Sequence, residues 1–120
     1  MNKEGKKYIM HRFASDYVTE EMSPGITRQI IGYDSNIMMV KVFFSRGAIG
    51  KMHSHPHQQI SYILSGKFEV NIGGKIVILG MEDSFKAPSN IDHEVKCVEE
   101  GIILDTFSPL REDFIKKTHC

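Results

Sequence analysis

Three histidines stand within five positions in the segment "HSHPH", and His93 follows in a later segment. On an extended strand His53 and His55 point to the same face, because alternate side chains share a face. Pro56 cannot donate a backbone hydrogen bond, so we expect the strand to end there and the chain to return at Gln59. Three imidazoles and one amide oxygen suit a divalent transition metal ion. The spacing therefore predicts a metal site made by His53, His55, Gln59 and His93, for one ion of nickel, zinc, iron, manganese or copper.

The residues of this motif and their neighbours also have interpretations that involve no metal. The histidines would also serve as polar loop residues, and Gln59 would also serve as a hydrogen-bonding residue of a strand. His57 follows a proline and breaks the alternation, so we expect it to support the ligands or to face solvent. Cys97 shares its face with His93 and is expected to be a small core residue rather than a nucleophile.

The elements that must position these residues are strands. Hydrophobic residues alternate in "NIMMVKVFF", "QISYILSG", "KFEVNIGG", "KIVIL", "HEVKCVEE" and "GIILDTFS", with no convincing helical stretch. Gly73-Gly74 predicts a two-residue hairpin, and Ser65-Gly66 predicts another tight turn. Tyr62 and Phe68 are expected in the core. The pattern predicts an all-β sandwich or jelly-roll barrel, which can leave a lined cavity.

Length and charge limit the function classes. A chain of 120 residues fits one domain, residues 1–120, with any site inside or on its single core. Lys plus Arg and Asp plus Glu each number 15, which argues against a nucleic-acid surface. The N-terminal sequence shows no signal peptide or membrane span, and two cysteines make no disulfide framework. We therefore expect a cytoplasmic protein that binds neither nucleic acid nor membrane.

The histidine motif extends to a wider pattern. Gly47, His53, His55, Gln59 and Gly66 resemble the first motif of the cupin superfamily, with glutamine where glutamate is commoner. The segment "GMEDSFKAPSNIDHEVKC" resembles the second motif, although its first part is longer than usual and Cys97 replaces a frequent asparagine. The resemblance implies a single-domain cupin, a double-stranded β-helix of the jelly-roll type.

The tail makes the resemblance closer. Together, "HSHPHQQISYILSGKFEVNIGG" and "GIILDTFSPLREDFI" resemble the small KdgF-like pectin-degradation cupins. That family binds a divalent metal through three histidines and a glutamine. It converts 4,5-unsaturated uronates, released from pectin- or alginate-type polysaccharides, into linear 5-keto-4-deoxyuronates. In that family the residues matching Asp105, Phe107 and Arg111 are linked to activity.

The residues of the tail agree with such chemistry. Asp105 and Phe107 share one strand face, and an acid in an apolar strand is costly to bury without a partner. We expect Asp105 to transfer a proton, Phe107 to shape the site, and Arg111 to anchor the substrate carboxylate with its planar guanidinium. The alternatives are a turn or cap role for Asp105 and a surface position for Arg111.

Three function classes remain open. The first is an isomerase-like metal-dependent enzyme acting on unsaturated uronates. Because Gln59 leaves the full charge on the metal, the site favours polarising a sugar-acid oxygen over the oxygen activation of a metal-dependent dioxygenase. That dioxygenase is the second class, and a module that only binds metal or a sugar acid is the third.

The strands of residues 1–35 offer edges for pairing, so we also expect a homodimer.

Overall fold

The computed structural model describes residues 10–116 as a nearly all-β domain with little helix. The elements are η1 (Ala14–Asp16), β2 (Thr19–Ser23), β3 (Ile26–Tyr33), β4 (Met38–Phe44), β5 (Ile49–His53), β6 (Gln58–Ile72), β7 (Lys75–Gly80), β8 (Ser84–Ala87), β9 (His93–Ser108) and α1 (Glu112–Lys116). The all-β prediction is confirmed, and the short helix α1 was not expected. Residues 1–9 and 117–120 lie outside the described part, so the first residues of the expected dimer segment fall there. Within residues 10–116, no helix has the length and apolar character needed to cross a bilayer.

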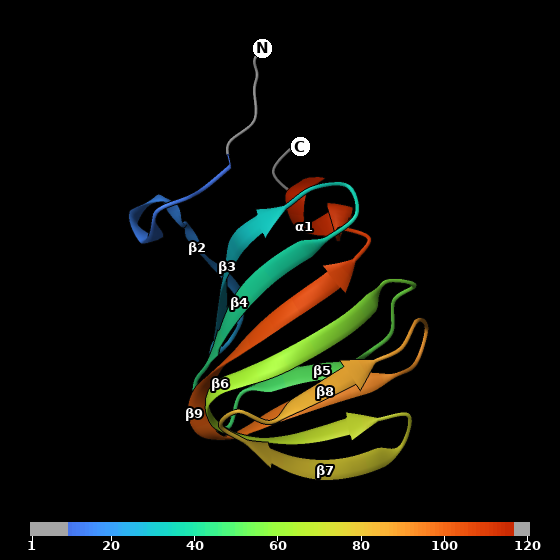
Figure 1. Cartoon of the computed structure of the whole chain (residues 1–120). Coiled ribbons are helices and arrows are strands. Elements are labelled where there is room, and N and C mark those ends of the chain that lie inside the picture. Colours follow the sequence, from blue (N-terminus) through green and yellow to red (C-terminus); the bar gives the residue numbers. More distant parts are fainter. Residues whose placement is uncertain (1–9, 117–120) are drawn as a thin grey trace.

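Two long strands, β6 and β9, organise the sheet. They pair antiparallel from Gln58 opposite Ser108 to Ile72 opposite His93. Residues 58–65 and 101–108 join β2, β3, β4 and β8 in what we call the β4 layer. Residues 67–72 and 93–97 join β5 and β7 in what we call the β7 layer. Both long strands curve sharply where the layers meet (Figure 1), so one antiparallel sheet folds over itself into the predicted jelly roll.

The bend occurs where the sequence predicted a tight turn, and that prediction was wrong. Strand β6 runs through Ser65 and Gly66, with shifts in its register against β9. Gly66 has φ +88°, and a Cβ there would lie 2.6 Å from the carbonyl oxygen of Glu100. A Cβ on Gly101 would lie 2.1 Å from the carbonyl oxygen of Ser65. The two strands therefore touch backbone to backbone at the bend, which only glycine allows.

The other predicted turn is confirmed. Gly73 and Gly74 join β6 to β7, with φ of +58° and +91°, and Ile72 faces Lys75 across the hairpin. Positive φ at both central residues is what a primed two-residue turn requires.

The core lies between the two layers. Strand β4 alternates buried and more exposed residues, so one of its faces lines the interior. Phe68 is fully buried, as predicted, whereas Tyr62 is 40% exposed on the outer face of β6. The prediction for Tyr62 was wrong because its neighbours Ser61 and Ile63 take the inward positions. Each large apolar side chain removed from water contributes about 1.5–3 kcal/mol to folding.

Candidate metal centre and cavity

The β7 layer and the loop after β5 bring three histidines together. His53 ends β5, His55 follows in the loop, and His93 begins β9 directly opposite His53. One nitrogen from each ring lies within 4.8 Å of the others. His55 and His93 are 6% and 2% exposed, whereas His53 is open to solvent. This three-histidine cluster could hold a metal ion.

Backbone carbonyl groups set the orientation of all three rings. The Nδ1 atoms of His53, His55 and His93 lie 2.7, 2.9 and 3.0 Å from the carbonyl oxygens of Lys51, His57 and Ile91, respectively. Since a carbonyl only accepts, each Nδ1 carries the proton and donates it. In the neutral rings the Nε2 atoms are then unprotonated, with lone pairs available to a ligand.

The surroundings of these Nε2 atoms fit a cation. His55 Nε2 lies 3.0 Å from Gln59 Oε1, so two hydrogen-bond acceptors face each other. The buried Nε2 of His93 has no hydrogen-bond partner. Burial, followed by the charge of Arg111 at His55 and of His53 at His93, lowers the pKa of both rings and favours their neutral, ligating form. A divalent ion would satisfy all three acceptor atoms, so the residues present fit the predicted metal.

Gln59 and Asp105 are held together in the β4 layer. The Gln59 side-chain amide donates to Ser61 Oγ at 2.9 Å and to Asp105 Oδ1 at 3.4 Å, which directs its oxygen towards His55. Ser61 Oγ donates to the same Asp105 oxygen at 2.6 Å. Burial raises the pKa of Asp105 to about 6, although Ser61, Arg111 and Gln59 each act to lower it. Asp105 lies within β9, so the alternative of a turn or cap residue was wrong.

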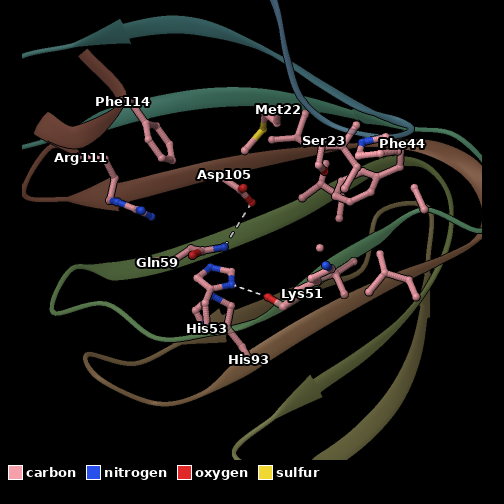
Figure 2. Close-up of a pocket in the computed structure, with 18 of the residues that line it drawn as sticks. Met22, Ser23, Phe44, Lys51, His53, Gln59, His93, Asp105, Arg111 and Phe114 are labelled. Carbon is pink, nitrogen blue, oxygen red and sulfur yellow. Dashed lines mark hydrogen bonds between the residues drawn. The ribbon is translucent and has the colours of Figure 1, made fainter. Parts of the chain in front are cut away.

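A cavity of about 620 Å³ runs between the two layers. Figure 2 shows His53 and His93 below Gln59 and Asp105, with Arg111 and Phe114 at one end and Met22, Ser23 and Phe44 at the other. Phe107 also lines the cavity. Most of the remaining lining is apolar, as in small-molecule sites that carry a few converging polar groups.

Arg111 lines this cavity, but one edge of its guanidinium is already in use. Its Nε and Nη2 donate to the two carboxylate oxygens of Asp113 at 3.1 and 2.9 Å. Burial alone would raise the pKa of Asp113, but the hydrogen bonds from Arg111 hold it below its usual value. With its side chain 13% exposed, Arg111 is not a free surface arginine. Only the remaining edge of the guanidinium is open to the predicted carboxylate contact.

Ser61 and Phe114 belong to the site but were not predicted, whereas expectations for His57 and Cys97 can be compared with the structure. Ser61 shares the inward face of β6 with Gln59, and that alternation was the signal that could have identified it. His57 is 9% exposed rather than solvated, and its Nε2 lies 3.4 Å from Glu112 Oε1 on α1. Phe114 reaches the cavity from α1, a helix too short to show a periodic pattern. Cys97 is buried, as predicted, and burial raises the pKa of its thiol.

Comparisons with known proteins agree on one family. The sequence matches the cupin domain family over residues 41–107. It is 46% identical to the pectin degradation protein KdgF of Dickeya dadantii (strain 3937), over 88% of this chain and all of that protein. The fold matches an RmlC-like cupin from Shewanella frigidimarina NCIMB 400 with a TM-score of 0.86 and 41% identity, covering 89% and 96% of the two chains. It matches KdgF from Halomonas sp. with a TM-score of 0.85 and 34% identity, covering 89% and 99%.

Proposed function

The chain belongs to the cupin superfamily, and to its KdgF-like members, and on this premise we propose that it is a metal-dependent enzyme of uronate metabolism. Its substrates are 4,5-unsaturated uronates from pectin- or alginate-type polysaccharides, and its products are linear 5-keto-4-deoxyuronates. The observation that carries the proposal is the placement of Asp105 and Arg111 in the same cavity as the histidine cluster. A proton-transfer group, a cation for a carboxylate and a metal site therefore converge on one substrate-sized space.

The ligands of the proposed metal are His53, His55, His93 and Gln59. A divalent ion held there would supply Lewis-acid polarisation of a substrate oxygen. Arg111 binds the uronate carboxylate through the guanidinium edge that Asp113 leaves open. Phe107, packed edge-on against the ring of His55 with centroids 5.8 Å apart, gives the cavity wall its shape beside the ligands.

Asp105 moves the proton in this proposal. The substrate is a cyclic hemiacetal whose ring oxygen is attached to an alkene carbon. Loss of the proton from the anomeric hydroxyl forms the aldehyde and breaks the bond from the anomeric carbon to the ring oxygen, which becomes an enolate oxygen. Delivery of a proton to carbon 4 then gives the 5-keto product. One proton leaves and one returns, so the reaction is an isomerisation that needs no oxidant or reductant.

The test uses an unsaturated galacturonate monomer prepared with a lyase. Wild-type protein is expected to speed the loss of ultraviolet absorbance of the conjugated alkene, with matching gain of the open-chain keto acid. Asp105→Asn should lower the turnover number by about 10²–10⁴, because an amide cannot accept and return the proton. Its metal content and melting temperature should match those of wild type.

Asp34→Asn is the matched control, because Asp34 lies in an exposed turn where an asparagine can accept the same backbone hydrogen bonds. It should leave turnover unchanged. If metal-loaded wild-type protein leaves the absorbance decaying at the spontaneous rate with several unsaturated uronates, the proposed reaction is wrong. Ligand binding without turnover would then favour a binding module, and oxygen consumption would favour a dioxygenase.

We further propose that the protein acts in the cytoplasm as a homodimer. Apolar side chains of the N-terminal segment support association, since Met10, Phe13 and Val18 are 81%, 65% and 70% exposed. Such side chains beside a sheet edge favour pairing with a second chain.

A further inference from the structure

Arg28 is a buried charge for which the proposed reaction has no use. It lies on β3 two residues after the inward-facing Ile26, on the same face of the strand, and it is 3% exposed. Its Nε donates to Glu20 Oε1 at 3.0 Å across the β2–β3 pair. Burying a guanidinium costs free energy even when it is paired, so its surroundings must give it further contacts.

The further contact is the ring of Phe114. The guanidinium carbon of Arg28 lies 4.0 Å from the ring centroid, and that of Arg111 lies 4.3 Å from the same centroid. Phe114 also packs edge-on against Phe107, with centroids 5.7 Å apart. One ring of α1 therefore contacts both arginines and an aromatic residue of the cavity wall, at the end of the cavity where Figure 2 shows Phe114 beside Arg111.

The helix that carries Phe114 depends on such contacts for its position. Helix α1 spans only Glu112–Lys116, and an isolated helix of that length is not stable in water. The ion pair of Arg111 with Asp113 lies within this tail and cannot anchor it to the barrel. Arg28 belongs to the sheet, so its contact with Phe114 ties the tail, and Arg111 with it, to a rigid strand.

We propose that Arg28 is a positioning residue for the substrate carboxylate, acting through Phe114 to hold Arg111 at the cavity mouth. This inference rests on the proposed function for the identity of the ligand, a uronate. It predicts that Arg28 affects binding of the carboxylate without touching substrate or metal.

The experiment measures KM and turnover with the unsaturated galacturonate, and the dissociation constant of D-galacturonate by calorimetry, on metal-loaded protein. Arg28→Met should raise KM and the dissociation constant about tenfold, because it removes the desolvated cation–π contact that holds Phe114 beside Arg111. Turnover at saturation and metal content should stay within about twofold of wild type. Arg28→Lys keeps the charge but loses the flat stacking group, so it should have an intermediate effect.

A cycle with Arg111→Lys separates positioning from general stability. If Arg28 acts through Arg111, the double variant should change the dissociation constant by much less than the product of the fold-changes of the two single variants. Phe114→Leu removes the shared ring and should reproduce the Arg28→Met effect, which keeps the test decisive if Arg28→Met fails to fold. The matched control is Lys41→Met, which removes another cation–π contact, to Phe43 at 5.3 Å. Lys41→Met should change neither KM nor the dissociation constant of D-galacturonate.

The inference is overturned if folded Arg28→Met or Phe114→Leu binds D-galacturonate as wild type does, or if the Arg28 and Arg111 effects multiply. Failure of the proposed reaction has a different signature, since wild type would then bind the uronate without turning it over. In that case the dissociation constants alone decide whether Arg28 positions Arg111.

Discussion

At the residue scale, the chemistry proposed for the site depends on hydrogen bonds that the candidate ligands make away from the proposed metal position. Each histidine Nδ1 is tied to a carbonyl group of its own segment, and the Gln59 amide is tied to Ser61 and Asp105. These contacts fix which atom of each side chain faces the centre before any ion binds. Loss of such support typically lowers metal affinity or activity by about 10- to 100-fold.

Purified wild-type protein is expected to carry about one divalent transition ion per chain by elemental analysis. His53→Ala combined with His55→Ala should abolish this content, because His93 and Gln59 alone provide too few ligands. His11→Ala is the control, since His11 is exposed outside the cluster, and it should keep the ion. Equal metal content in the double variant would remove the proposed site.

The sequence predicted the histidine cluster and the neighbouring Gln59 better than it predicted the contacts around Arg111. His53, His55 and Gln59 are close in sequence, so strand alternation and one proline were enough to bring them together. Arg28 and Phe114 come from opposite ends of the chain, and no local pattern links them. Their contact arises only when α1 packs against β3, which is a property of the folded chain.

At the element scale, the bend of β6 and β9 separates the two layers and creates the cavity between them. Local chemistry could not distinguish this bend from a turn, because Ser65-Gly66 is a suitable signal for both. The partner strand β9 determines that the chain bends here and does not turn back, because Gly101 allows the two backbones to touch. For the same reason the two segments "HEVKCVEE" and "GIILDTFS" form one continuous strand, whereas the Gly73-Gly74 hairpin, which needs no partner, was predicted correctly.

Gly101→Ala should lower the free energy of unfolding by about 3 kcal/mol or more, because its Cβ would overlap the backbone of β6. Urea unfolding followed by circular dichroism measures the change. Gly32→Ala is the matched control, since a Cβ at Gly32 in β3 meets nothing within 4 Å. Its stability should stay the same or rise by up to about 1 kcal/mol. Equal stability of the two variants would refute the close crossing.

At the scale of the whole molecule, the predicted homodimer follows from the apolar N-terminal segment. Light scattering at micromolar concentration should give twice the mass of the chain. Val18→Lys should shift the protein towards monomer, because Val18 is 70% exposed directly before the edge strand β2. Ile76→Lys, on the exposed face of β7, is the matched control and should leave the dimer intact. A monomer mass for wild type would contradict the prediction.

The β6–β9 pairing also determines when the site can exist during folding. Joining Gln58 to Ser108 closes a loop of about fifty residues, which costs chain entropy before its contacts repay it. Domains dominated by such distant pairings typically fold in milliseconds to seconds. Gln59 lies at one end of this ladder and His93 at the other, and only the bend turns the two ends towards each other. The proposed metal centre would therefore be a late product of folding, and an ion that binds there would stabilise the finished barrel without guiding its assembly.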